Sequence, residues 1–446
     1  ETGIDGRGGG AGRGGGQGST DNFQIAGRNG ISTTNALGIN YSDQWSKKFT
    51  VSGSYFFNAT NNENIGSSNR EQFITADSST FYGEQSVARN KSTSHRINMR
   101  MEYKIDSNNT LLIIPSANFQ SNNNASAISG LQSFSNNTPI SGTNNISKTN
   151  GNGYNLSNTF LFRHAFSKRG RSLSAGITTG FNNRDAVQEV TAISTFYKAS
   201  VAEYDSLLQQ QVSETKGYNL SANVSYTEPL GKKSQLQFSY NPSFTHSNAD
   251  QRTFAFDPSA NKFALLDTSL SNVFVNEVTT QRGGISYRFG DRDKNLSFGI
   301  DAQSATLDNS QTFPQAGTLK KSFTNLLPNA MYRIKLSEKS NLRLFYRSST
   351  NNPSVNQLQN VINNNNTLYL TTGNPDLSQS VSNRFGGRYT YTNSRKGTSL
   401  LVNLFGNQAD NYITNATYTA FADSVLTPTV TLFRGSQLSK PINLNG

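Results

Sequence analysis

The stretch INMRMEYKID (residues 97–106) decides the fold, because apolar and polar side chains alternate along its whole length. Successive side chains of a β-strand point to opposite faces, so the pattern predicts a strand with one apolar and one charged face. The apolar positions are Ile97, Met99, Met101, Tyr103 and Ile105, and the polar ones are Asn98, Arg100, Glu102, Lys104 and Asp106.

The same pattern continues on both sides of a short polar turn, which predicts a β-hairpin. After DSNN (106–109) the chain resumes with TLLIIPSANF, and the unit of strand, turn and strand recurs to give seven hairpins, or about 14 strands. The predicted turns lie at 46–48, 106–109, 167–171, 229–233, 290–295, 337–340 and 393–397.

Between the hairpins lie longer segments rich in Asn, Ser and Thr, such as 120–153, which we expect to be long loops. Short turns at one end and long loops at the other are typical of outer-membrane barrels, whose apolar band is about 25 Å tall and whose strands tilt by about 40°. A soluble β-sandwich also alternates, but its connections are usually short at both ends. We therefore predict an all-β fold, a transmembrane antiparallel up-and-down β-barrel.

Composition supports this fold class and excludes others. Of the 446 residues only 33% are hydrophobic and the mean hydropathy is -0.58, which excludes a helical membrane protein. The 28 Phe and 18 Tyr are too many for a disordered chain. Cysteine is absent, so disulfides and thiolate metal sites are excluded.

The net charge of +12 is concentrated in and beside the predicted turns, for example at Lys47, Lys48, Arg169, Arg395 and Lys396. We interpret these cations as solvated residues beside lipid headgroups, with no nucleic acid as a partner. The segment GRGGGAGRGGGQG (6–18) resembles an arginine–glycine motif, but no RNA-binding module accompanies it. We assign 1–30 to a Gly-rich flexible loop and 31–446 to the barrel region.

No catalytic or metal-binding constellation is visible. His95, His164 and His246 are isolated, and no pair has the spacing of metal ligands or of a Ser/His/Asp arrangement. We expect neither an enzyme nor a cofactor or metal ion.

The most specific stretch is LRLFYRSSTNNPSVNQLQNVINNNNTLYLTTGNPDL (342–377). It resembles the barrel of TonB-dependent outer-membrane receptors, in which a strand ending in Tyr-Arg precedes a Pro-Ser-x-x-Gln-Leu segment and a later Gly-Asn-Pro-x-Leu. The matching residues are Tyr346, Arg347, Asn352, Pro353, Ser354, Gln357, Leu358, Gly373, Asn374, Pro375, Asp376 and Leu377. In that family the motif is architectural and names no substrate.

The resemblance implies energised uptake of a bulky nutrient (a metal chelate, glycan or peptide) across the outer membrane of a Gram-negative bacterium. Its implied partners are outer-membrane lipid, a plug domain, a TonB-type energising protein and a surface lipoprotein. The family's barrel has 22 strands and a plug, neither of which is visible here, so we expect an interior part of a longer barrel. The alternatives are a surface scaffold or adhesion barrel, and a passive pore.

Period two also predicts which charges face the lumen. If the apolar set faces lipid, certain charged residues near the short turns point inward. The cations among them could pair with neighbouring lumen residues and water, or with acidic groups of a plug. These lumen candidates are Arg100, Glu102, Lys104, Arg163, Arg288, Arg333, Lys335, Arg343 and Arg388.

Overall fold

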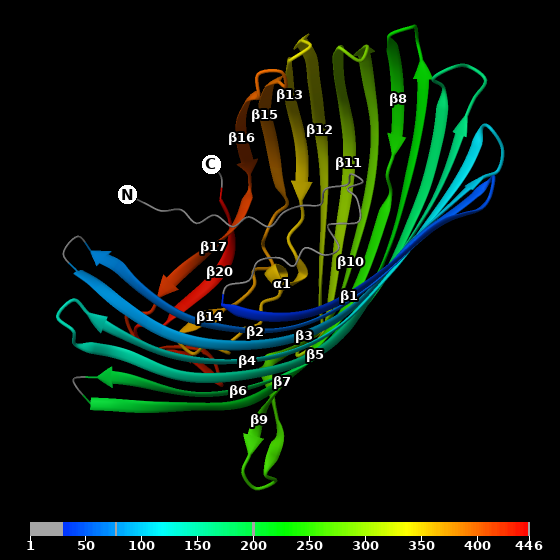
Figure 1. Ribbon diagram of the computed structural model, residues 1–446. Helices are drawn as coiled ribbons and strands as arrows, with labels where there is room; N and C mark the ends of the chain where they lie inside the picture. Colours follow the sequence, from blue (N-terminus) through cyan, green and yellow to red (C-terminus); the bar gives the residue numbers. More distant parts are fainter. Residues whose placement is uncertain (1–29, 76–77, 199–200, 445–446) are drawn as a thin grey trace.

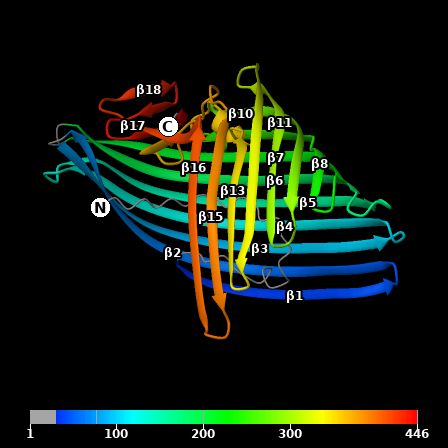
Figure 2. The same ribbon diagram turned by 90° about the horizontal axis from the view of Figure 1, so that it is seen from above.

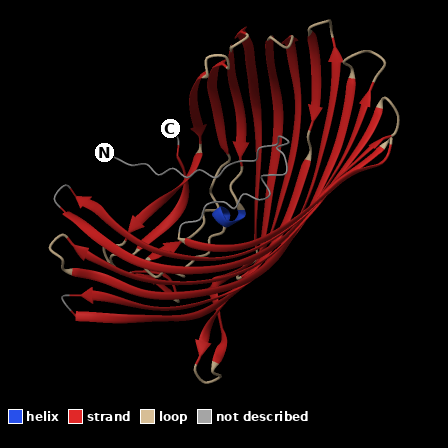
Figure 3. Ribbon diagram, viewed as in Figure 1, coloured by secondary structure: helices blue, strands red, loops and turns tan. Residues whose placement is uncertain are grey.

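A computed structural model describes residues 30–75, 78–198 and 201–444, so the assignment of 1–30 falls almost wholly outside the described residues. The described chain is nearly all strand (Figure 3). Among these residues no helix is long and apolar enough to cross a membrane. The main strands are β1 (Ile31–Ser46), β2 (Phe49–Thr75), β3 (Ser78–Lys104), β4 (Asn109–Phe134), β5 (Pro139–Ala165), β6 (Ser172–Lys198), β7 (Val201–Pro229), β8 (Ser234–Tyr240), β9 (Ser243–Asp257), β10 (Lys262–Gly290), β11 (Lys294–Phe313), β12 (Gly317–Ser337), β13 (Ser340–Asn351), β15 (Ser380–Asn393) and β16 (Thr398–Asp410).

These 15 strands form one antiparallel sheet, which confirms the all-β prediction. The strands follow one another across the sheet in chain order. Between β7 and β10 lies one strand position that β8 and β9 occupy end to end, because the strand is broken at Asn241 and Pro242. The order therefore has 14 positions, as expected, and each predicted short turn joins two neighbouring strands. Figures 1 and 2 show a strongly curved trough, with β1 and β16 at its edges among the described strands.

Asp carboxylates stabilise two of the short turns, 106–109 and 290–295. Asp106 accepts hydrogen bonds from the backbone N–H groups of Asn108 (2.7 Å) and Asn109 (2.8 Å), and the side chain of Asn109 bonds to it as well. These bonds, led by that of the Asn109 side chain, lower the pKa of Asp106. Lys233 of turn 229–233 lies 2.7 Å from Asp291 of turn 290–295. Its hydrogen bond is the main cause that lowers the pKa of Asp291 to about 2.

Strand register joins the alternating positions into two continuous faces. Tyr55 pairs with Ile97, and Ile113 pairs with both Met101 and Phe160, so apolar side chains of successive strands share a face. This is the convex face of the trough, and its large apolar side chains are exposed. They include Ile39, Ile97, Met99, Phe160, Ile177, Leu220, Val224, Phe238, Ile285, Phe298, Leu344, Val402 and Leu404.

The prediction of long loops is wrong for most of the polar segments. Residues 120–153 belong to β4 and β5, which are joined only by residues 135–138. Strands of 26–29 residues run from β2 to β7, and at about 3.3 Å per residue they reach roughly 90 Å, far beyond the ~25 Å apolar band. Outside lipid a strand needs backbone pairing but no apolar face, so Asn, Ser and Thr suffice.

Two segments fold into the trough and together form an inner layer: residues 352–379, the longest connection between strands of the sheet, and residues 411–444, which follow β16. It contains α1 (Val355–Leu358) and three strands that pair with one another, β14 (Tyr369–Thr371), β20 (Gln437–Leu444) and β17 (Tyr412–Thr419). A small hairpin of β18 (Ser424–Thr427) and β19 (Val430–Leu432) completes it. In Figure 1 this layer lies on the concave side of the sheet, toward the ends opposite the short turns.

The inner layer holds much of the buried apolar core. Leu370 packs with Leu270 of β10, and the ring of Phe433 stacks on Phe196 of β6 at 4.2 Å between centroids. Arg70 of β2 lies over the Tyr369 ring at 4.9 Å. The layer is therefore a packed part of the fold.

Lipid exposure of the convex face predicts that Val224→Arg costs about 2–4 kcal/mol of barrel stability, because it places a cation in hydrocarbon. Ser221→Arg, on the concave face of the same strand, is the matched control and should cost far less. Urea unfolding of both variants in lipid vesicles measures this. Equal losses would contradict the face assignment.

Packing of the inner layer predicts where proteinase K cuts intact cells. Cleavage should occur at the exposed connection 135–138, whereas 362–372 should resist because Leu368 and Leu370 are buried. Mass spectrometry of released peptides locates the cuts. Rapid cleavage within 362–372 would show that the layer is open in the cell.

Candidate functional site

Register places all nine lumen candidates on the concave face, the face that also meets the inner layer. Arg288 of β10 is opposite Ser297, whereas its neighbour Tyr287 is opposite the convex-face Phe298. Asn145, Gln188 and Gln209, which bond to the inner layer, lie on the same face as these charged residues. The nine therefore share a face but do not form one cluster.

Four of the nine lie away from the rest, on β3 and β5. Arg100 donates to Glu102 at 2.9 Å, so the charges of this pair are matched. Lys104 and Arg163 are on the same wall of the trough. Lys335, at the end of β12, lies 3.9 Å from Asp293 of a turn.

The other four candidates join three further arginines in what we call the basic wall, on β10, β12, β13 and β15. Arg333 is directly opposite Arg343, and Arg343 is directly opposite Arg388. Four residues further along β13, Arg347 is directly opposite Arg384 of β15. The basic wall comprises Arg282, Arg288, Arg333, Arg343, Arg347, Arg384 and Arg388.

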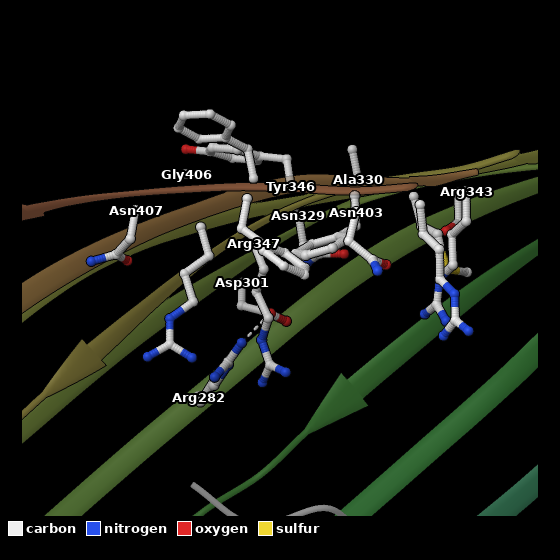
Figure 4. Close-up of a pocket in the computed structure, with 17 residues that line it drawn as sticks. Arg282, Asp301, Asn329, Ala330, Arg343, Tyr346, Arg347, Asn403, Gly406 and Asn407 are labelled. Atoms are coloured by element: carbon white, nitrogen blue, oxygen red, sulfur yellow. Dashed lines mark hydrogen bonds and ion pairs between the residues drawn. The ribbon is translucent and has the colours of Figure 1, made fainter. Parts of the chain in front are cut away.

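Two adjoining hollows lie along this wall. The larger, of about 1360 Å³, is lined by Arg282, Arg347 and Arg384 together with the amides of Asn329 and Asn403. Figure 4 shows Arg282, Arg347 and Arg343 on one side of the sheet and Tyr346 on the other. The smaller, of about 570 Å³, lies nearer the turns, and the two share Arg343 and Arg388.

Few groups in the described chain balance this charge. Asp301 bonds to Arg282 at 2.6 Å, and Asn295 accepts from Arg288 at 3.2 Å. Within residues 30–75, 78–198 and 201–444, no carboxylate lies within ion-pair distance of the remaining wall arginines, which are Arg333, Arg343, Arg347, Arg384 and Arg388.

Such an arrangement costs free energy. Like charges directly opposite each other on neighbouring strands destabilise a sheet by up to about 1 kcal/mol per pair. Guanidinium groups bind carboxylates and phosphates in bidentate fashion, so a polyanion seated here would relieve the repulsion. The arginines without carboxylate partners therefore match the charge and geometry of carboxylates and phosphates.

Sequence reasoning did not select Arg282, Arg384 and Asp301, and it placed Arg347 only in the family motif. The same period-two rule would have sent all four inward, because they lie on the concave face. Among the described residues no group of three or more His, Asp or Glu side chains could hold a metal ion.

The motif residues bond to one another across the connection between β13 and β15, within the inner layer. Ser354 donates to the side chain of Gln357, while the backbone carbonyl of Gln357 accepts the N–H of Asn374 at 2.6 Å. Leu358 and Leu377 pack against Leu307 of β11. A Cβ at Gly373 would overlap the backbone of Gln359, so glycine is required there.

The remaining motif residues lie before and after this group and make further hydrogen bonds. Tyr346 and Arg347 lie on β13, and Tyr346 donates to Asn383 of β15 at 3.0 Å. Asn352 and the buried Pro353 follow β13 directly. Asn374 bonds through its side chain to the carbonyl of Pro441 (2.9 Å), and the N–H of Asp376 beyond Pro375 bonds back to Asn374. The motif thus turns the chain out of β13 and returns it toward β15.

Comparison with known protein families shows the family to which this chain belongs. Residues 164–434, more than half of the chain, match the outer membrane protein beta-barrel family. The chain belongs to this family. It is therefore a β-barrel protein of the Gram-negative outer membrane, as predicted.

Among solved structures, the barrel protein is similar to the hemophore receptor HasR of Serratia marcescens, solved as a double mutant in complex with its hemophore HasA and heme. The identity is 10% and the TM-score 0.46, over 92% of this chain and 58% of that chain. The chain thus spans less than two thirds of the length of HasR. A comparison with curated proteins finds no match.

The basic wall predicts that tripolyphosphate stabilises the purified barrel protein in detergent, because the anion offsets arginine repulsion. Thermal unfolding should shift upward by several degrees in the wild type, and Arg343→Gln/Arg388→Gln should abolish most of the shift. Arg169→Gln/Arg395→Gln, in two separate turns, is the control with the same loss of charge. An equal shift in all three proteins would show non-specific binding.

Proposed function

We propose that this chain is the barrel of an outer-membrane transporter of the TonB-dependent type, which takes up a bulky nutrient. The observation that carries the proposal is the basic wall, whose arginines other than Arg282 lack carboxylate partners among the described residues. A plug domain with acidic groups, held inside the barrel, would supply them. The motif at 342–377 supports the same family.

The inner layer is consistent with this role. It lies across the concave side near the ends of the strands that point away from the short turns, so it narrows the path into the lumen. A packed layer there restricts free passage, as selective admission of a substrate requires. A metal chelate, a glycan or a peptide is the substrate class of such a barrel.

The proposal includes the arrangement around the sheet. Strand edges cannot lie unpaired in lipid, so β1 and β16 would pair with further strands of a closed barrel of about 22 strands. Its partners would be outer-membrane lipid, a TonB-type energising protein on the periplasmic side and a lipoprotein at the surface. A scaffold or adhesion barrel is the second candidate, favoured by the long strands that extend beyond the membrane.

Docking of a plug on the basic wall predicts a permeability defect. In the full-length protein, Arg333→Gln/Arg343→Gln should loosen the plug and make cells several-fold more sensitive to vancomycin, which is too large for ordinary porins. Heat-modifiable mobility on gels should show that the barrel still assembles. The turn variant Arg169→Gln/Arg395→Gln should leave sensitivity unchanged.

Unchanged sensitivity in a well-assembled Arg333→Gln/Arg343→Gln protein would argue against plug docking on this wall. Loss of the energising protein separates the two functions. It should abolish nutrient uptake by a transporter and leave a scaffold unaffected.

A further inference from the structure

A third hollow on the concave face differs in chemistry from the two along the basic wall. It has a volume of about 790 Å³, within the range of about 300–1,000 Å³ typical of ligand sites, and lies on β3–β6. Its lining contains no Asp, Glu or Lys and a single Arg, and it is dominated by Asn and Gln. We call it the amide groove.

The groove is shaped by a column of small residues on β5. Gly151 and Gly153 face the trough, and they form its floor because they carry no side chain. Across from Gly151 stand Asn122 of β4 and Ala186 of β6, and Gly153 is opposite Gln120. The amide side chains of Gln120 and Asn122 therefore project into the trough beside two residues without side chains.

At one end the floor is closed by a row of three amides. Asn118 of β4 is directly opposite Asn155 of β5, which is directly opposite Asn182 of β6. The carbonyl oxygens of Asn90 and Asn118 are buried and accept no hydrogen bond from the described residues. Such groups gain most from a donor that arrives with a ligand.

At the other end the groove meets the inner layer. Gln188 accepts a hydrogen bond from Asn365 at 3.0 Å and donates to Ser147 at 2.9 Å. The groove therefore runs from the inner layer toward the turn end of the trough, along the wall opposite the one that carries the arginines.

An amide offers two donors and one acceptor oxygen, and a hydroxyl both donates and accepts. A surface of neutral amides therefore matches a neutral ligand with many hydroxyls. A charged ligand would find only Arg184, and an extended peptide would find neither an open strand edge nor apolar pockets for its side chains, since Ala186 is the one apolar residue on this side of the groove.

We propose that the amide groove binds a neutral oligosaccharide, which makes a neutral glycan the substrate class of the proposed transporter. The proposal rests on the proposed function for its biological role and on the groove alone for binding. The lining includes one aromatic residue, Tyr154, and the register places it on the opposite face of β5 from Gly151 and Gly153. We therefore expect the ligand to be held mainly by hydrogen bonds to the amides, and to bind weakly.

The test uses the purified full-length protein in detergent on an array of neutral oligosaccharides, acidic oligosaccharides and unstructured peptides. The wild type should bind a subset of neutral oligosaccharides. Asn118→Leu/Asn155→Leu removes a directly opposed amide pair from the groove and should weaken that binding about tenfold or more, as loss of two or more hydrogen bonds implies.

The matched control is Asn123→Leu/Asn150→Leu, which changes a directly opposed amide pair on the other face of the same two strands. It should bind like the wild type, with both variants showing the wild-type heat-modifiable mobility. Equal binding by both double variants, binding only to acidic glycans or peptides, or no binding to any neutral glycan would each overturn the proposal.

Failure here is distinguishable from failure of the proposed function. Vancomycin sensitivity and dependence on the energising protein report transport whatever the substrate, whereas the array reports the groove whether or not the barrel transports.

Discussion

The need to pair every backbone N–H and C=O group in hydrocarbon is the constraint on which the rest of this structure depends. It forces the lipid-crossing segments into a sheet in which each interior strand bonds to two neighbours. Once they are paired, the pleat sends alternate side chains to opposite faces, so an apolar convex face leaves a polar concave one. The basic wall, the amide groove and the seat of the inner layer all lie on that second face.

The parts of the fold closest to lipid were predictable from sequence. Alternation in stretches such as 97–106 is strong because lipid demands it, and turns such as 106–109 carry Asp and Asn that bond to their own backbone. Beyond the membrane this demand disappears. Ile128, Leu131 and Ile146 are too sparse to mark a strand, so β4 and β5 resembled a loop although they pair along their whole length.

The candidate site was predictable only in part. Period two sent Arg333, Arg343 and Arg388 inward, but their direct opposition follows from register, which depends on turn geometry to the single residue. The inner layer was missed because its contacts join distant segments, such as Leu270 with Leu370. The motif identified Leu358 and Leu377 but gave no sign of Leu307, the buried residue against which both pack.

The length of the strands has a consequence for how such a protein can change. An insertion of one residue within β4 would exchange its two faces beyond that point, bringing amides of the groove outward and apolar residues inward. A length change that keeps both faces adds two residues to each of two paired strands. Alternatively, a single added residue can form a bulge at the end of the hairpin. Surface diversification in this architecture should therefore proceed in even steps, with the hairpins growing or shrinking as units.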